Sequence, residues 1–263
     1  MPGRLLVIDI GNTQIVLGVY DGEDIVASWR IDTRKKRTED EFAIIVSQLF
    51  TLEGVAMESV SDVAISCVVP AVLPIVASFA KSAFSCEPLI VGPGVKTGVS
   101  INIENPKELG ADRIANAAGA LASYEPPLIL VDFGTAITID VVSAKSEYLG
   151  GAIVPGIRLS LNALYERAAK LPDIEFARPP SVIGKNTVTS MQSGAYYGYV
   201  SLVDGIVNRV KESLAPKTPK VIATGGEARL VAPASSTIDV VEERLTLEGL
   251  RVIHMKNRVN IRQ

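Results

Sequence analysis

The chain has 263 residues, of which 48% are hydrophobic, and its formal net charge at pH 7 is −3. This length and composition allow a sizeable core, or two small lobes that share a cleft. The slightly acidic balance, without a basic stripe, argues against nucleic-acid binding. Polar residues break the apolar segment near the N-terminus, and no apolar run approaches the ~20 residues that span a bilayer. We therefore expect a cytoplasmic protein without a signal peptide or a membrane partner.

Cysteine and histidine usage excludes several kinds of site. The only cysteines, Cys67 and Cys86, have no metal-binding spacing and are expected to be reduced and buried. A Ser-His-Asp triad would have to recruit the sole histidine, His254, from an amphipathic helix near the C-terminus. That placement argues against triad chemistry.

The first informative stretch is an apolar run that ends in Asp9 and a turn. A second apolar run at 15–20 ends in an Asp-Gly hairpin signal, so we predict a strand, a tight turn and a strand. Gly11 lets the backbone turn sharply and a ligand approach. Asn12 and Thr13 offer donors that suit phosphate oxygens, and Asp9 could hold a cation. An ordinary hairpin, with Asp9 as a turn former, explains this segment equally well.

Between residues 25 and 84 the pattern alternates strands with helices, which indicates an α/β fold. Thr38 and Glu41 form a predicted capping box. The basic run 34–37 before it is either a solvated loop or a patch that attracts anionic substrates. The predicted elements are a strand at 25–31, a helix from residue 38 to about 52, a strand at 60–68 and a helix at 71–84.

Residues 89–98 contain a predicted strand followed by Gly92 and Gly94, as at the start of a dinucleotide-binding fingerprint. That fingerprint requires a helix next. Here residues 99–103 alternate like an extended strand, and the Asn-Pro pair that follows prevents continuation. We therefore reject a Rossmann site, and the sequence contains no P-loop motif either.

An alanine-rich helix is predicted to begin at about Ala111. Asp112 then lies in its first turn, where the helix dipole favours a carboxylate. The functional alternative is a general base beside a cleft, with Arg113 binding an anionic group of a substrate. From this stretch alone, the dipole explanation is preferred.

A second hairpin repeats the layout of the first at an offset of 132 − 9 = 123 residues. Asp132 corresponds to Asp9 and Gly134 to Gly11, and a following strand is predicted at 137–142. An aspartate-and-turn hairpin that occurs twice, about half a chain apart, is typical of a duplicated fold. Two such hairpins facing each other would hold a nucleotide triphosphate between two lobes.

A third stretch, 221–228, is a predicted strand that runs into Gly225 and Gly226 and then a helix. Backbone without side chains allows a flat ring to lie against it. The two hairpins and this stretch, in this order, resemble the two phosphate motifs and the adenosine motif of the actin, hexokinase and sugar-kinase superfamily.

The remaining elements are mostly helical. Residues 150–157 are predicted to form a glycine-rich loop that leads into a helix to about residue 170. Residues 184–187 are predicted to cap a long helix at 188–214, and a final amphipathic helix is predicted at 245–256.

Gly194, Gly198 and Gly205 lie inside the predicted long helix. Glycine in a helix interior is unfavourable by about 1 kcal/mol relative to alanine. Such glycines are tolerable where another helix packs closely. A dimer seam and a tight contact within the chain explain them equally well.

Five motifs together resemble the type III pantothenate kinases over nearly the whole chain. They are, in order, residues 9–13, 110–113, 132–136, 150–157 and 224–227. The resemblance implies ATP, Mg²⁺, a monovalent cation such as K⁺ or NH₄⁺, and a homodimer. It also implies that Asp112 is the general base, and not only a carboxylate that the helix dipole favours.

The chain departs from the family pattern at two positions. Ile103 stands where the family often has a tyrosine that contacts pantothenate, which puts that contact in doubt. Ile137 stands where a second threonine is expected, and we interpret it as a strand residue.

The expected fold is therefore α/β, with two duplicated actin-like (ribonuclease H-like) lobes, 1–117 and 118–263, and a nucleotide cleft between them. The expected reaction transfers the ATP γ-phosphate to the 4′-hydroxyl of pantothenate, the first step of coenzyme A biosynthesis. The expected partner is this small molecule, with no nucleic acid.

The resemblance also implies a role for each site residue. Asp112 is the expected base, Asp9 would hold Mg²⁺ through water, and Asp132 would hold the monovalent cation. The expected pantothenate-binding residues are Gly110, Ala111, Asp112, Arg113 and Thr187. Of these, Thr187 is expected to reach the pantothenate bound in the partner subunit's site. The expected ATP-binding residues are Asp9, Ile10, Gly11, Asn12, Thr13, Gln14, Ile15, Val16, Thr135, Gly225 and Gly226.

Two alternatives remain open. A nucleotide-binding regulator without turnover would share the fold but would not need Asp112. A kinase of another small hydroxy acid would share the fold and the base.

Overall fold

The computed structural model describes residues 3–261, with side chains up to residue 258. The described chain divides into two compact units. The first comprises residues up to 99, 105–122 and the stretch from 245 onwards, and the second comprises 100–104 and 123–244. The predicted lobe boundary between residues 117 and 118 falls inside helix α3 (Ala111–Ser123). The first unit instead keeps α3 to residue 122 and includes the C-terminal helix α7 (Leu245–Ile261).

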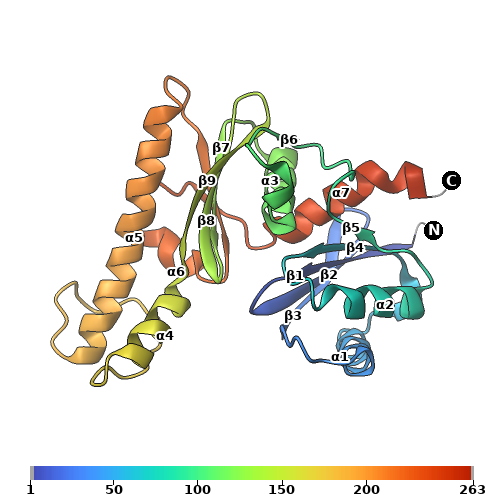
Figure 1. Ribbon diagram of the computed structural model, residues 1–263, viewed down its shortest axis with the longest axis horizontal. Helices are drawn as coiled ribbons and strands as arrows, with labels where there is room; N and C mark the ends of the chain where they lie inside the picture. The colour runs from blue at the N-terminus through green and yellow to red at the C-terminus, as the bar shows by residue number, and fades with distance from the viewer. Residues whose placement is uncertain (1–2, 262–263) are drawn as a thin grey trace. The chain divides into compact units, whose positions relative to one another are not determined.

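The first unit contains a five-stranded mixed sheet in the order β3-β2-β1-β4-β5 (Figure 1). Its first three strands are antiparallel neighbours, whereas β1, β4 and β5 run parallel. The strands are β1 (Arg4–Ile10), β2 (Gln14–Asp21), β3 (Asp24–Asp32), β4 (Val60–Cys67) and β5 (Leu89–Ile90). These confirm the strands predicted up to residue 68.

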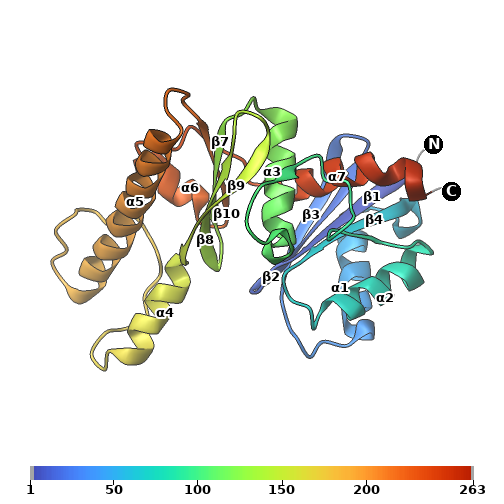
Figure 2. The same ribbon diagram turned by 45° about the horizontal axis from the view of Figure 1, so that its top comes forward.

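Helices cover both faces of this sheet (Figure 2). On one face, α1 (Glu39–Leu52) and α2 (Leu73–Phe84) pack onto alternate residues of β1, including Ile8 and Ile10. On the other face, α7 contacts β1, β2 and β4. Alternation along β1 thus supplies apolar residues to both helix layers.

The helix starts follow the predicted local signals. Thr38 caps α1 and forms the predicted capping box with Glu41. Asn186 caps α5 (Thr187–Ser213), and its box partner is Thr189. Each side chain satisfies a backbone N–H that has no partner inside its helix.

The second unit repeats the sheet of the first. The order of its strands is β11-β10-β7-β8-β9-β6, in which β7, β8 and β9 are antiparallel neighbours and β7, β10 and β11 are parallel. Without β6 and read from the other edge, this order is β9-β8-β7-β10-β11. It matches β3-β2-β1-β4-β5 of the first unit strand for strand, which confirms the predicted duplication. The strands are β6 (Ser100–Ile101), β7 (Leu128–Phe133), β8 (Ala136–Val142), β9 (Glu147–Pro155), β10 (Lys220–Gly225) and β11 (Val240–Val241).

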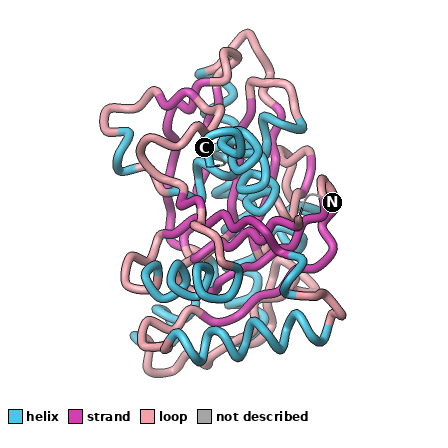
Figure 3. The backbone as a smooth tube through the Cα atoms, turned by 90° about the vertical axis from the view of Figure 1, so that its right-hand side faces the viewer, coloured by secondary structure: helices cyan, strands magenta, loops and turns pink. Residues whose placement is uncertain are grey.

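The helices of the second unit are α4 (Ile157–Arg167), α5 and α6 (Ala228–Val231). The buried face of α5 packs onto β7 and β8, where Val203 and Val207 share one core with Val131 and Ile139. Figure 3 distinguishes the helices, strands and loops of the backbone by colour. The described chain also has 3₁₀ turns, which are Met57–Ser59 and Pro106–Glu108 in the first unit and Ala232–Ala234 in the second.

Residues 150–155 are part of strand β9, so the prediction of a loop at 150–157 is wrong. The strand pairs with β8, where Gly151 lies opposite Asp140. A Cβ at Gly151 would collide with the backbone of Ile139, and Gly150 has a φ of +103° beside a register shift. These glycines therefore serve close backbone approach and an irregularity within a strand, rather than a free loop.

Two further features of the described chain concern the segment after β5 and the apolar character of the helices. Residues 92–99, after β5, form turns and no helix, as expected for a segment that is not a dinucleotide-binding fingerprint. Among the described residues, none of the helices combines the length and the apolar character that crossing a membrane requires.

Candidate functional site

The first predicted phosphate hairpin forms as expected. Asp9 on β1 pairs with Val16 on β2, and Ile10 pairs with Ile15. The N–H of Gly11 donates to the carbonyl oxygen of Gln14 at 3.0 Å, which closes the turn. Asn12, Thr13 and Gln14 are exposed at its tip, where their side chains and backbone N–H groups can meet a ligand.

Thr33, a residue that we did not predict, holds this turn from the end of β3. Its N–H donates to the carbonyl of Thr13 at 2.9 Å, and its hydroxyl donates to the carbonyl of Gly11 at 2.7 Å. In the second unit, the N–H of Gly156 likewise donates to the carbonyl of Thr135 at 3.0 Å. The two donors are 156 − 33 = 123 residues apart, which is the offset between the two aspartates, whereas the two acceptors are 135 − 13 = 122 residues apart.

The Asp9 carboxylate lies half-buried at the end of β1. Ser66 is the register neighbour of Asp9 on the parallel strand β4, is fully buried, and donates its hydroxyl hydrogen to Oδ1. Burial, and more weakly the negative charge of Asp9, raises the pKa of the nearby Cys67 thiol, although a hydrogen bond with the backbone of Val69 acts in the opposite direction. Asp9 is thus a fixed carboxylate beside the phosphate turn.

The second hairpin and the diglycine stretch meet in one sheet. Asp132 on β7 pairs with Thr138 on β8 and with the buried Thr224 on β10. Gly225 has a φ of +91°, and a Cβ there would lie 2.5 Å from Oδ1 of Asp132. The N–H of Gly134 donates to the carbonyl of Ala136 at 3.2 Å and closes the turn. The second predicted phosphate motif, the adenosine motif and Asp132 are therefore adjacent.

A buried polar group continues from this hairpin along β8 and was not predicted. Asp140 and Tyr148 are both fully buried, and the Tyr148 hydroxyl donates to Asp140 Oδ1 at 2.5 Å. Thr138, opposite Asp132, donates to the other Asp140 oxygen at 3.0 Å. Ile137, the departure from the family pattern, is fully buried in the apolar core, as expected of a strand residue.

Asp112 lies in the first turn of α3, as predicted. It is half-buried, and its Oδ1 accepts from the N–H of Arg113 at 2.8 Å. A Cβ on Gly110 would collide with this carboxylate and would lie 3.6 Å from Cγ1 of Val68. Because the N–H of Val68 donates to the carbonyl of Ile10 at 3.0 Å, the start of α3 lies beside the end of β1. The first unit therefore brings the predicted base region close to the first phosphate motif.

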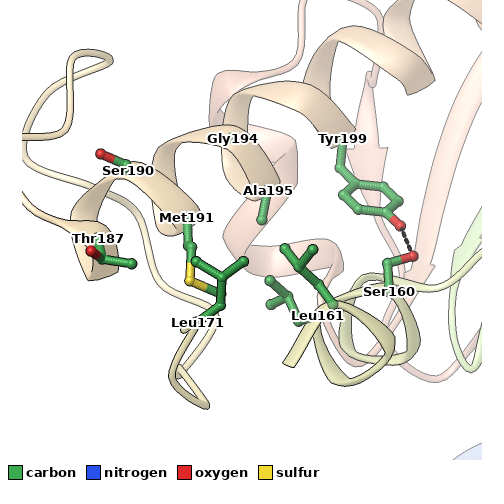
Figure 4. Close-up of a pocket in the computed structure, with 10 residues that line it drawn as sticks. Ser160, Leu161, Leu171, Thr187, Ser190, Met191, Gly194, Ala195 and Tyr199 are labelled. Carbon is green, nitrogen blue, oxygen red and sulfur yellow. Dashed lines mark hydrogen bonds between the residues drawn. The ribbon is translucent and has the colours of Figure 1, made fainter. Parts of the chain in front are cut away.

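Thr187 is the first residue of α5 and is exposed. It lies at one end of a pocket of about 620 Å³ between α4 and α5 (Figure 4). At the other end, the Tyr199 hydroxyl lies 2.6 Å from Oγ of Ser160. The lining is mostly apolar and comprises Ser160, Leu161, Leu164, Leu171, Thr187, Ser190, Met191, Gly194, Ala195 and Tyr199.

Metal ligation by a dense side-chain cluster does not occur in the part of the chain that the structure describes. No three His, Cys, Asp or Glu side chains gather there in a metal-binding group.

Comparison with known proteins points to one family. The family model of the type III pantothenate kinases matches residues 5–209. The type III pantothenate kinase of Geotalea daltonii is 52% identical over 97% of this chain and 99% of its own length. That of Exiguobacterium sp. is 54% identical over the same shares of the two chains.

The solved structures support the fold. MreB 5 of Spiroplasma citri, bound to AMPPNP, superposes with a TM-score of 0.58 at 10% identity, over 100% of this chain and 99% of that one. At this identity the likeness concerns the fold alone, and it confirms the predicted actin-like lobes.

Proposed function

Because this chain belongs to the type III pantothenate kinase family, we propose how its residues divide the work of phosphoryl transfer. The chain is a kinase that uses ATP to phosphorylate pantothenate in coenzyme A biosynthesis. The observation that carries this function is the full-length similarity to type III pantothenate kinases, together with the family motif at residue 9 and its repeat at residue 132. Phosphoryl transfer depends mainly on positioning and on neutralising charge, and both hairpins present turns suited to these tasks.

Asp112 is the proposed general base. It would accept the proton of the 4′-hydroxyl as that oxygen attacks the γ-phosphate. Support comes from its half-buried position at the start of α3, beside the end of β1. Gly110 leaves room for the carboxylate, because any side chain there would collide with it.

Pantothenate is proposed to bind along the start of α3. Arg113 would pair with its carboxylate or with a nearby acceptor. Gly110 and Ala111 would line the acceptor site. Thr187, at the N-terminus of α5, would offer a hydroxyl and free backbone N–H groups to the polar end of the substrate.

ATP is proposed to contact both hairpins and the diglycine stretch. The exposed turn residues Asn12 and Thr13 would bind phosphate oxygens, as would Thr135 in the second hairpin. Gly225 and Gly226 would carry the adenosine, since no atom of the described residues other than Gly226 and its two chain neighbours lies within 4 Å of the position that a Cβ on Gly226 would take. The remaining contacts are assigned to the hairpin residues Asp9, Ile10, Gly11, Gln14, Ile15 and Val16.

The two aspartates fit two different cations. Asp9, held by Ser66, would bind Mg²⁺ through water. Asp132 would hold K⁺ or NH₄⁺, with the turn carbonyls of Gly134 and Thr135 as neighbouring oxygens at the second hairpin. When bound, these cations neutralise the charge of the phosphates.

A homodimer is proposed as the working form. Support comes from Gly194 and Gly198, which are exposed on α5 and have open space around the position of a Cβ among the described residues. The partner's helix would then carry its Thr187 towards this subunit's acceptor. A cytoplasmic location is proposed because the reaction consumes ATP and both cysteines are free.

The base assignment can be tested with Asp112→Asn and a matched control. Asp40 occupies the first turn of α1 as Asp112 occupies that of α3, so Asp40→Asn removes a comparable helix-dipole interaction. We expect Asp112→Asn to lower kcat by about 10²–10⁴-fold, as loss of a positioned base does. ATP binding should be nearly unchanged, and Asp40→Asn should retain wild-type turnover. Turnover of Asp112→Asn within a few-fold of wild type would refute the base.

A further inference from the structure

The basic run 34–37 forms one wall of a second pocket, of about 390 Å³, in the first unit. The other wall is the first half of α1. The lining residues are Arg34, Lys36, Arg37, Glu41, Ile44 and Ile45. Lys35 belongs to the same run but does not line the pocket. Three cationic side chains thus face one carboxylate and two isoleucines.

Arg37 provides a donor without an acceptor. Its Nη1 atom is buried and has no hydrogen-bond partner among the residues that the structure describes. A buried donor of a charged group is costly to leave unpaired. Arg37 itself lines the pocket, so its guanidinium keeps hydrogen-bonding capacity beside the pocket.

The neighbouring carboxylates do not neutralise the pocket. Glu41 accepts the N–H of Thr38 at 2.9 Å through Oε2, because it belongs to the capping box of α1. Asp32 lies 3.9 Å from Arg34, and both side chains are more than two-thirds exposed, at 71% and 72%. Exposed pairs of this kind are weak, so the pocket keeps an excess of positive charge.

The chemistry of the lining identifies the class of ligand. Two arginines and one lysine line the same pocket, and guanidinium and ammonium groups match the oxygens of a phosphate dianion. Ile44, which is 58% exposed, and Ile45 add an apolar wall suited to a short carbon skeleton. We infer that this pocket is a second anion site that binds a phosphomonoester dianion, with its carbon skeleton against the two isoleucines.

The basic run that lines this pocket directly follows Thr33, the residue that holds the first predicted phosphate turn. Thr33 donates to the carbonyls of both Gly11 and Thr13, and Arg34 is the next residue. A phosphate bound by 34–37 therefore restrains the segment that braces the nucleotide turn. The inference goes beyond phosphoryl transfer, because none of the residues assigned to ATP or pantothenate lines this pocket.

The test is a phosphate titration of the full chain with a non-hydrolysable ATP analogue at saturation, so that the nucleotide phosphate positions are filled. The thermal unfolding midpoint is measured against inorganic phosphate concentration, at an ionic strength held constant with chloride. For wild type and for Lys35→Gln we expect a saturable rise. Arg37→Gln should need about tenfold more phosphate, since it loses a charge-assisted hydrogen bond. Lys35→Gln is the matched control because it removes the same charge from the same run.

A second variant guards against misfolding of Arg37→Gln. The double variant Arg34→Gln/Lys36→Gln keeps Arg37 in place and should weaken phosphate binding as well. Both variants should retain pantothenate turnover, so a failure of this inference is separable from a failure of the kinase assignment. Equal midpoint rises in all variants, or no rise in wild type, would overturn the inference.

A second arm uses 4′-phosphopantothenate in place of inorganic phosphate. Tighter binding of this ester, lost in Ile44→Ser, would support the proposed apolar wall. Equal affinity for the two probes would overturn the phosphomonoester assignment in favour of free phosphate.

Discussion

Gly225 is subject to one predicted and one observed constraint. The sequence pattern predicts it as a place where a flat ring approaches bare backbone. The structure adds a second constraint, because its φ is +91° and a Cβ would lie 2.5 Å from Oδ1 of Asp132. Gly226 has neither constraint, since the structure places no described atom within 4 Å of its Cβ position.

This contrast gives a matched pair of substitutions. We expect Gly225→Ala to lower the free energy of unfolding by about 1–3 kcal/mol, the usual cost of a strained backbone conformation. It should also weaken activation by K⁺, because the new methyl group displaces the Asp132 carboxylate. Gly226→Ala should leave the unfolding free energy within about 0.5 kcal/mol of wild type. Denaturant unfolding and a K⁺ titration of activity measure both effects, and equal unfolding free energies for the two variants would contradict the account.

Residues in the turns were predictable, but the residues that hold them were not. Asp9, Gly11 and Asp132 stand in a local pattern that repeats along the chain. Ser66, by contrast, reaches Asp9 across 57 residues of sequence, and this contact depends on the register of two parallel strands. Local patterns cannot encode such a register, and they do not show that Thr33 donates to the carbonyls of the first turn either.

Among the helices and strands, the predictions that rest on a local capping or hairpin signal were confirmed. The prediction for the stretch 150–155, which has no such signal, was wrong. The capping box at Thr38 and the paired hairpins form as predicted. The glycine-rich stretch at 150–155 has no alternation of apolar and polar residues, so it was interpreted as a loop. Its strand character comes from pairing with β8, which is a tertiary contact.

The surroundings of the α5 glycines bear on one of the two explanations left open by the sequence. The explanation by a close contact within the chain is wrong for Gly194 and Gly198, because no described atom outside the adjoining part of α5 lies within 4 Å of either Cβ position. These positions share one helix face. The dimer seam is the explanation that remains for them, and it stays a prediction.

Subunit mixing tests this seam through the sites that it would complete. We expect Asp112→Asn and Thr187→Ala homodimers to be nearly inactive. If Thr187 acts in the partner's site, each mixed dimer has one intact site and one doubly mutated site, and about a quarter of wild-type activity returns at statistical mixing. If both residues act in the same chain's site, every site carries one lesion and activity stays absent.

A control pair shows that recovery depends on the seam. Asp112 and Asp132 are both assigned to the site of one chain, so mixing Asp112→Asn with Asp132→Ala should restore nothing. Subunit exchange is verified by native mass spectrometry. No recovery in verified Asp112→Asn/Thr187→Ala dimers would refute the shared site.

At the scale of the whole molecule, the duplicated sheet was predictable and the division of the chain was not. The repeat offset of 123 residues predicts two related units, and their sheets share one strand order. No local sign in the sequence indicates that α7 packs onto β1, because that contact joins the two ends of the chain. The predicted boundary near residue 118 followed sequence order, whereas compact units follow contacts in space.

We claim that this chain phosphorylates pantothenate with ATP, and an assay of its products can show this. Purified protein is incubated with ATP, Mg²⁺ and pantothenate in K⁺ buffer, and products are followed by mass spectrometry. We expect 4′-phosphopantothenate and ADP in equal amounts, with a lower rate when Na⁺ replaces K⁺ at the same ionic strength. ATP binding without a phosphorylated product would favour a regulator, and phosphorylation of other small hydroxy acids but not of pantothenate would favour a different kinase. Either result would contradict the claim.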